Sequence, residues 1–379
     1  MKKAIVAFSG DPITYGHIDI IDRALKVFDH VTVGIGVNPD KKYTFDLSTR
    51  EEMAKRVLKK YGRHINVQSF KGLLIDFAYE KCIGTIIRGV RNSSDVDYEK
   101  ILHEVNRSQE LGIDTYVLFA DQKLSHVSSS AVKELQKYHA RELLQYVPLL
   151  VKSALEQTIS EQCKMGITGE IGAGKSYVAR RFVDLGTKNN ISVHNIELDN
   201  IGHYILEQSD EPIAKKARKD LITFFGDSIK KGNFIDRKKL GKLLWNRTVN
   251  IGIFNDIMTK PIMLQYRREL TNKTGLILVN SALIAEADIS EIVNNDVLIV
   301  EASKEVKHKR LAKRGYSKKE IEDRIMSQYD TDKKQKIINN KIKFYDYGHI
   351  LRLDNSLEGK VADERIVQMF NTIISGFEI

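Results

Sequence analysis

The chain has 379 residues, of which 42% are hydrophobic and 29% are charged, and this composition excludes a disordered chain, a collagen-like fibre and a disulfide-rich miniprotein. No stretch approaches the roughly 20 consecutive apolar residues of a membrane-spanning helix, and the first residues lack the apolar core of a signal peptide, so we expect a cytoplasmic protein without a membrane partner. The formal net charge of +10 leaves nucleic-acid binding open until the basic residues have been located.

Apolar, β-branched runs alternate with helical patterns over the first 160 residues. The predicted strands cover 4–8, 31–37, 65–69, 85–88 and 115–118, and the predicted helices cover 18–27, 48–61, 74–81, 94–111, 128–138 and 141–147. Strands that alternate with helices of this length indicate an α/β fold with a parallel sheet and helices on both faces.

Four segments at the predicted strand ends are suited to binding phosphate. Thr14-Tyr15-Gly16-His17 places a histidine at the start of a helix, where free N–H groups and the helix dipole favour anions. Arg88–Arg91 follows the fourth strand, Ser128–Ser130 opens a later helix, and Lys41 comes after the second strand. A lone Thr-x-Gly-His element is as often a capping loop, but four such segments at the strand ends of an open α/β sheet predict a nucleotide site.

These segments, together with Gly72-Leu73-Leu74, Tyr98-Glu99 and Asn106-Arg107, resemble the bacterial phosphopantetheine adenylyltransferases, which are Rossmann-like nucleotidyltransferases. The resemblance implies that residues 1–160 transfer the adenylyl group of ATP to 4′-phosphopantetheine and release pyrophosphate, with His17, Lys41 and Arg91 as catalytic groups. It places phosphopantetheine at Ser9, Lys41, Leu74 and Arg88. It places ATP at Ser9, Gly10, His17, Gly89, Val90, Arg91, Glu99, Leu124, Ser125, His126, Val127, Ser128, Ser129 and Ser130.

The loop after the first strand departs from this family. The family has Pro-Gly-Thr/Ser-Phe-Asp-Pro, whereas this chain has Ala7-Phe8-Ser9-Gly10-Asp11-Pro12, so that the aromatic residue and the glycine have changed places. If the position of Phe8 requires a positive φ, Phe8 is strained there. Two hypotheses follow: an active adenylyltransferase, or a first domain that binds without catalysing and leaves a kinase-only enzyme.

The α/β pattern starts again after residue 160, with predicted strands at 165–168, 192–197, 276–280, 297–301 and 350–353. A predicted helix at 150–162 leads into this half without a Pro-, Gly- or Ser-rich linker. We therefore expect two domains, 1–160 and 161–379, each built on a parallel sheet. The two cysteines, Cys82 and Cys163, have no metal-binding spacing and are expected to be free thiols.

A Gly-x-x-x-x-Gly-Lys-Ser sequence, Gly169–Ser176, lies between a predicted strand and a predicted helix. This context is that of a P-loop, in which Lys175 reaches the β- and γ-phosphates and Ser176 is a ligand of Mg²⁺. Glu197 and Asp199 end the next strand, and acids on alternate strand residues face the same side. Asp199 is therefore a candidate base for a hydroxyl acceptor, and its alternative role is that of a helix N-cap.

Residues 165–375 resemble the dephospho-coenzyme A kinases, which phosphorylate the 3′-hydroxyl of dephospho-coenzyme A. The matching segments are Thr168–Ser176, Glu197-Leu198-Asp199, Ile235-Asp236-Arg237, Arg310–Arg314 and Arg324–Gln328. The resemblance implies Lys175 and Asp199 as catalytic residues and ATP contacts at Gly172, Ala173, Gly174, Lys175, Ser176, Tyr177 and Arg314. Departures at Glu197, 260–262 and 282–286 predict an altered affinity for the acceptor.

Residues 304–343 carry 14 Lys or Arg against 6 Asp or Glu, a local charge of +8. This stretch could bind nucleic acid, form a solvated helical face, or act as a lid over phosphate. The kinase resemblance favours the lid, with Arg310 and Arg314 on the transferred phosphate, and we expect no nucleic-acid partner.

The two resemblances together are those of a bifunctional coenzyme A synthase-like fusion, because the product of the first reaction is the substrate of the second. We expect ATP, 4′-phosphopantetheine and dephospho-coenzyme A as substrates, Mg²⁺ as cofactor, and a homo-oligomer through the first domain.

Overall fold

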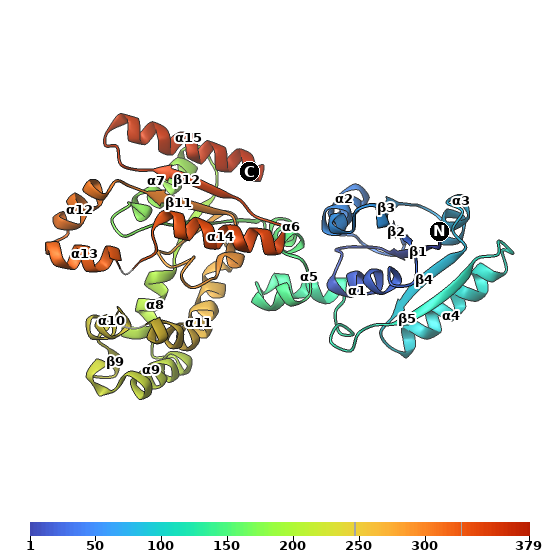
Figure 1. Ribbon diagram of the computed structural model, residues 1–379, viewed down its shortest axis with the longest axis horizontal. Coiled ribbons are helices and arrows are strands. Elements are labelled where there is room, and N and C mark those ends of the chain that lie inside the picture. The colour runs from blue at the N-terminus through green and yellow to red at the C-terminus, as the bar shows by residue number, and fades with distance from the viewer. Residues whose placement is uncertain (246–247, 327) are drawn as a thin grey trace. The chain divides into compact units, whose positions relative to one another are not determined.

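The computed structural model describes residues 1–245, 248–326 and 328–379. The chain folds into two compact units, Met1–Ser160 and Glu161–Ile379 (Figure 1). Each unit contains one five-stranded sheet in which all neighbouring strands are parallel. The predicted fold class, two α/β units with parallel sheets, is therefore confirmed.

The sheet of the first unit has the strand order β3-β2-β1-β4-β5. Its strands are β1 (Lys3–Phe8), β2 (His30–Ile35), β3 (Ile65–Ser69), β4 (Thr85–Val90) and β5 (Asp114–Phe119). The central strand β1 is apolar and buried from Ala4 to Ala7, as a strand flanked on both sides should be. The order reverses between β1 and β4, and ligands of open α/β sheets bind at such a switch point.

The described part of the unit has six α-helices and two 3₁₀ turns, which lie between these strands and, for the last three, after β5. They are α1 (Tyr15–Ala24), α2 (Leu47–Leu58), η1 (Lys59–His64), α3 (Leu74–Glu80), α4 (Ser93–Arg107), α5 (Ser129–Lys137), η2 (Arg141–Gln145) and α6 (Leu149–Ile159). Helix α1 begins three residues before its predicted start, because the His17 imidazole accepts a hydrogen bond from the Thr14 amide and closes the first turn. Helix α2 ends at Leu58 and continues as η1, where Gly62 has a φ of 55°.

The sheet of the second unit has the order β12-β11-β6-β10-β7. Its strands are β6 (Gln162–Thr168), β7 (Val193–Glu197), β10 (Gly275–Asn280), β11 (Val297–Glu301) and β12 (Ile350–Asp354). Every residue of β6 is buried, so the strand that leads into the P-loop is the centre of this unit. A short antiparallel hairpin, β8 (Lys230–Lys231) and β9 (Phe234–Ile235), was not predicted.

Helices surround this sheet on both sides and extend it at one end. They are α7 (Lys175–Lys188), α8 (Leu198–Glu207), α9 (Pro212–Phe225), α10 (Arg237–Trp245), α11 (Thr248–Leu270), α12 (Lys304–Lys313), α13 (Lys318–Met326), α14 (Thr331–Tyr345) and α15 (Lys360–Phe377), with turns η3 (Asp227–Ile229) and η4 (Ser290–Val293). Figure 1 shows α8 to α11 gathered with the hairpin into a helical extension. Helices α7 and α15 share a separate core cluster, in which Phe182 and Phe370 are in contact. No helix of the described residues is long and apolar enough to cross a membrane.

Candidate active sites of the two units

His17 lies in the first turn of α1 and is held by its own helix cap. Its Nδ1 is 3.0 Å from the Thr14 amide nitrogen and 3.0 Å from the Thr14 hydroxyl. Because the amide N–H can only donate, Nδ1 accepts, and the ring proton of the neutral imidazole is on Nε2. Burial, together with the smaller effects of the Arg91 and Lys41 charges, lowers the pKa of His17 to about 4. His17 is therefore a neutral hydrogen-bond donor at ordinary pH.

Two further predicted cations surround His17. Arg91 is fixed by Asp95, whose carboxylate accepts from both the Arg91 amide and its Nε at 3.0 Å. The Lys41 ammonium is 3.4 Å from the Ser9 hydroxyl. The structure thus brings His17, Arg91, Lys41 and Ser9 together at the carboxyl edge of the sheet, beside the β1–β4 switch point, where an anion would meet four side-chain donors.

Arg88 and Glu99, which were predicted to bind different substrates, are bound to each other. The Arg88 guanidinium donates to both Glu99 oxygens, at 2.7 and 2.5 Å, and also to the Ala7 carbonyl at 3.0 Å. Gly89 and Val90 form the end of β4, which is two residues longer than predicted. The roles of Arg88 and Glu99 toward the two substrates stay predictions.

The segment from Leu124 to Ser130 packs against the loop that precedes α1. Ser129 donates to the Pro12 carbonyl at 2.9 Å, and Ser128 caps α5 by accepting from the Ala131 amide at 3.1 Å. These two hydroxyls are therefore engaged in the structure, and the start of α5 offers backbone N–H groups instead. Ser125 bonds to its own turn, Val127 is buried, and His126 contacts Tyr146. Leu74 lies apart from this group and packs with the core cluster around Ile5 and Phe77.

The rearranged loop is not strained in the way the sequence suggested. Phe8 is the last residue of β1 and pairs with Ile35 of β2, in ordinary extended backbone. The positive φ, 63°, falls on Gly10, a residue that tolerates it. The expectation of strain at Phe8 is therefore wrong.

The P-loop of the second unit runs from the buried end of β6 to Lys175, the first residue of α7. Gly174 has a φ of 100°, and a Cβ there would come within 2.2 Å of the Asn355 amide nitrogen. That amide donates to the Ala173 carbonyl at 2.8 Å, so only glycine fits this position.

The Lys175 ammonium donates to the Gly169 and Glu170 carbonyls at 2.9 and 3.1 Å, and burial lowers its pKa to about 8. Ser176 follows in the first turn, and Tyr177 is exposed.

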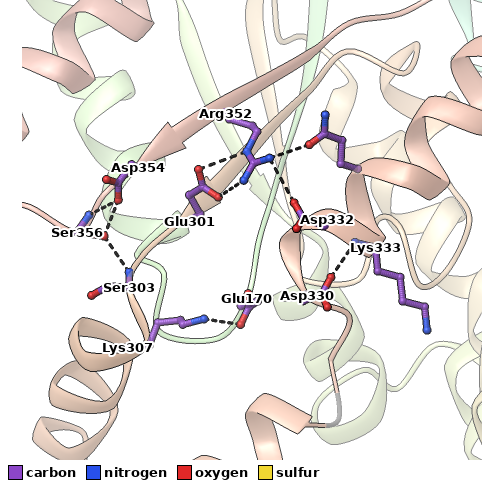
Figure 2. A network of polar contacts seen from close by, with 11 residues as sticks. Glu170, Glu301, Ser303, Lys307, Asp330, Asp332, Lys333, Arg352, Asp354 and Ser356 are labelled. Atoms are coloured by element: carbon purple, nitrogen blue, oxygen red, sulfur yellow. Dashed lines mark hydrogen bonds and ion pairs between the residues drawn. The ribbon is translucent and has the colours of Figure 1, made fainter.

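Side chains from the predicted lid support the P-loop. Figure 2 shows Lys307 of α12 reaching Glu170, at 2.5 Å. Arg310 donates to the Ala173 carbonyl at 3.0 Å and to the Asn355 carbonyl at 2.8 Å, and Gln328 accepts from the Ile171 amide at 2.7 Å. Arg310 is thus held by the loop itself, and its role on the transferred phosphate stays a prediction. Arg314 ends α12 close enough for its charge to act on Lys175.

Asp199 lies in the first turn of α8, not on the strand. Strand β7 ends at Glu197, which occupies the cap position of α8 without making a side-chain cap bond and instead accepts from Asn195 and Asn200. The prediction that both acids share one strand face is therefore wrong. The Asp199 Oδ1 accepts from the Ser281 hydroxyl at 3.0 Å, and its charge acts on Lys175. Asp199 is not the cap of α8, and its carboxylate stands beside the P-loop lysine.

Comparisons with known proteins agree with this division. Residues 163–344 match a family model described as dephospho-CoA kinase, and residues 9–135 match one described as cytidylyltransferase-like. A phosphopantetheine adenylyltransferase of Clostridium kluyveri is 45% identical to this chain, over 36% of this chain and 84% of the relative. A phosphopantetheine adenylyltransferase of Shouchella clausii is 38% identical, over 41% of this chain and 98% of the relative. This chain belongs to the phosphopantetheine adenylyltransferase family in its first unit and to the dephospho-CoA kinase family in its second. The predicted fusion of these two families, the enzymes of the last two steps of coenzyme A biosynthesis, is confirmed.

Three residues that the sequence analysis passed over are central to the two sites. Arg50 is buried and donates to the Ser9 carbonyl at 2.5 Å and to the Gly36 carbonyl at 3.0 Å, so it fixes the loop beside His17. Ser281 holds Asp199, and Lys334, which is fully buried, forms an ion pair with Glu286 near Lys175. Lys334 lies in a basic stretch of sequence that does not distinguish it from its neighbours. Its spacing of four residues from Ile338, on one face of α14, was the sequence feature that indicated burial.

Proposed function

We propose that this chain carries out both steps: adenylyl transfer to 4′-phosphopantetheine at the His17 site, then phosphorylation of dephospho-coenzyme A at the P-loop site. The observation that carries the proposal is the presence, in one chain, of a neutral His17 among cations and of a P-loop lysine beside Asp199. Residues 1–160 are the proposed adenylyltransferase domain and residues 161–379 the proposed kinase domain.

In the first step a phosphate oxygen of 4′-phosphopantetheine attacks the α-phosphorus of ATP, and the bond to the bridging oxygen of pyrophosphate breaks. The nucleophile is already anionic at neutral pH, so no protein base is needed. The work of the site is to align the two phosphates and to stabilise negative charge in the transition state. His17 donates from Nε2, and Lys41 and Arg91 supply positive charge.

In the second step the ribose 3′-hydroxyl of dephospho-coenzyme A attacks the γ-phosphorus of the second ATP, and ADP leaves. A neutral hydroxyl is a poor nucleophile, so a carboxylate that orients it and accepts its proton is required. Asp199 supplies that carboxylate. Lys175 withdraws charge from the β- and γ-phosphate oxygens, with Arg314 as a further cation at the end of α12.

Mg²⁺ is the proposed cofactor of both steps, and the residues near Lys175 fit it. The Ser176 hydroxyl and the Asp199 carboxylate are oxygen donors, and the Glu286 Oε2 is buried without a hydrogen bond among the described residues. The described residues contain no group of three or more His, Cys, Asp or Glu that could hold a metal ion. Ser176 and Asp199 would hold the ion together with oxygens of the bound phosphates, and the ion would screen the charge of those phosphates.

We also propose that the first unit associates with a second copy of itself. Apolar side chains are exposed on α4, at Tyr98, Ile101 and Val105, and on the sheet edge β5, at Tyr116 and Phe119. Such a face is typical of a surface that a partner covers. Light scattering of the chain and of an Ile101→Glu variant tests this, and a wild-type monomer at all concentrations would contradict it.

The decisive experiment supplies ATP, Mg²⁺ and 4′-phosphopantetheine and follows the products by mass. The wild-type chain should form coenzyme A, ADP and pyrophosphate. Asp199→Asn should accumulate dephospho-coenzyme A with pyrophosphate release intact, because loss of a general base costs about 10²–10⁴ in rate. His17→Ala should lose about 10²–10³ in pyrophosphate release but still phosphorylate added dephospho-coenzyme A. A wild-type chain that forms coenzyme A only from added dephospho-coenzyme A supports the kinase-only alternative.

A further inference from the structure

Phe8 lies face to face with the His17 imidazole. The two ring centroids are 4.2 Å apart and the ring planes differ by 20°. Phe8 comes from the end of β1 and His17 from the first turn of α1, so the stack joins the central strand to the helix that carries the proposed transition-state donor. A stacked aromatic pair of this geometry is worth a measurable free energy beyond the area it buries.

The Phe8 ring also occupies the space in front of Gly10. A Cβ built at Gly10 would lie 3.3 Å from Phe8 Cε2, 3.4 Å from Phe8 Cδ2 and 3.4 Å from Ile35 Cδ1. A side chain at position 10 would therefore compete with the Phe8 ring for one place. The two changes in the loop, an aromatic residue at 8 and a glycine at 10, are thus a single adjustment that places one ring against His17.

The stack supplies a restraint on His17 that its other contacts do not give. Thr14 holds Nδ1 at the edge of the imidazole, and an edge contact leaves the ring able to tilt about that bond. Phe8 covers one face of the ring and removes that freedom. The same contact keeps water from that face and contributes to the burial that makes His17 hard to protonate.

We infer that Phe8 is a positioning residue for adenylyl transfer: its ring fixes the plane of the His17 imidazole and so aims the Nε2–H at the charge that develops on the phosphate. The inference rests on the proposed function of the first unit. In this inference the rearranged loop takes part in the reaction. The departure of the loop from the family sequence had instead suggested a loss of activity.

The test compares Phe8→Leu, which keeps apolar bulk without an aromatic face, with Phe8→Tyr, which keeps the stack. We expect Phe8→Leu to lower kcat for pyrophosphate release about three- to tenfold, the range of one aromatic pair, with the KM values for ATP and 4′-phosphopantetheine changed less than about twofold. Phe8→Tyr should restore most of the rate. Phe77→Leu, which breaks the stack between Phe77 of α3 and Phe70, is the matched control and should leave kcat unchanged.

A second measurement is independent of turnover. The chain is labelled in its histidine rings, and the His17 signal is identified by its absence in His17→Ala. We expect the titration midpoint of His17 to be higher in Phe8→Leu than in the wild type, because a Leu side chain covers less of the imidazole face and admits water, and to stay in place in Phe8→Tyr and Phe77→Leu.

The outcomes separate this inference from the proposed function. If the wild-type chain releases no pyrophosphate, the proposed function of the first unit fails and the inference fails with it. If the wild type is active and Phe8→Leu matches it in both kcat and His17 titration, Phe8 is packing only and the inference alone is overturned. Phosphorylation of added dephospho-coenzyme A should be equal in all variants, and a general loss there would show damage to the whole chain.

Discussion

Ser281 shows how one hydroxyl defines the orientation of a carboxylate. Its Oγ donates to Asp199 Oδ1 at 3.0 Å and accepts from the Leu283 amide at 3.2 Å, while its own amide is bonded to the Ile167 carbonyl at 3.1 Å. The hydroxyl is thus fixed beside the end of β6, and it occupies one oxygen of Asp199 and leaves the other for the acceptor. A serine directly after a strand is common, so the sequence alone does not identify Ser281 as a partner of Asp199.

We predict that Ser281→Ala lowers kcat for phosphorylation of dephospho-coenzyme A by about tenfold, because a hydrogen bond to a charged group is worth about 1.5–3 kcal/mol. The KM for ATP should not change, since Lys175 and the P-loop are untouched. Ser281→Thr keeps the hydroxyl and is the matched control. Initial rates of ADP formation measure both variants, and an undiminished kcat in Ser281→Ala would show that Asp199 needs no such support.

The low pKa of His17 makes the stability of the first unit depend on pH. The folded chain holds this pKa near 4, whereas the unfolded chain has the ordinary value of 6.5, so the unfolded state binds one more proton between these two values. The stability that His17 contributes is therefore present above pH 6.5 and is lost as the pH falls toward 4. We predict that between pH 7 and pH 5 the wild type loses about 2 kcal/mol more than His17→Gln. Urea unfolding of both proteins at the two pH values measures this, and equal losses would place His17 in a solvated site.

At the scale of elements, helix α14 is anchored to the edge of the sheet so that Lys334 reaches the P-loop region. Figure 2 shows Arg352 of β12 joined to Glu301 of β11 and to Asp332 in the first turn of α14. Lys334, two residues further along α14, is fully buried and donates to the Ala282 carbonyl at 2.7 Å and to Glu286. Burial lowers the pKa of Lys334, and the Glu286 carboxylate opposes that shift.

We predict that Lys334→Met lowers the free energy of unfolding of the second unit by about 3–5 kcal/mol, because Glu286 is left as an uncompensated buried charge. Adding Glu286→Gln should recover part of the loss. Lys336→Met, an exposed neighbour on the same helix, should have little effect. Urea unfolding followed by far-ultraviolet circular dichroism measures the stability of each variant. Equal stabilities of Lys334→Met and Lys336→Met would contradict the ion-pair argument.

The elements that the sequence predicted well are those with long apolar periodicity. The five strands of each sheet and the P-loop at the end of β6 could be predicted because their residues form apolar, β-branched runs, which are most continuous in buried parallel strands such as β6. The β8–β9 hairpin could not, since two-residue strands carry no period. Asp199 was assigned to a strand because alternation cannot locate the residue where a strand gives way to a helix. The partners of Lys307, Arg310 and Lys334 depend on contacts distant in sequence, which no local pattern contains.

At the scale of the whole molecule, part of the basic charge in residues 304–343 is internal. Lys307 is paired with Glu170, Lys334 with Glu286, and Lys341 with Asp288 and Glu291. Arg310 is occupied by P-loop carbonyls. The stretch that made a nucleic-acid patch conceivable therefore uses several of its cations to support the proposed kinase site, which favours the lid interpretation.

Each proposed site is assembled from residues of its own unit: the His17 group lies within Met1–Ser160, and the Lys175–Asp199 group lies within Glu161–Ile379. The two sites should then work when they are on different molecules. We predict that His17→Ala and Asp199→Asn, each unable alone to convert 4′-phosphopantetheine into coenzyme A at a substantial rate, restore synthesis when mixed. Dephospho-coenzyme A made by the Asp199→Asn chain is free to reach the kinase site of the His17→Ala chain.

The mixture, at twice the total chain concentration, contains as many intact sites of each kind as the wild type. Its steady-state rate should therefore equal that of the wild type once dephospho-coenzyme A has accumulated to its working level. The time course of coenzyme A after addition of ATP and 4′-phosphopantetheine measures this directly. A mixture that forms no coenzyme A would mean that one site depends on the intact other unit, because a freely released intermediate cannot distinguish the chain that made it from the chain that consumes it.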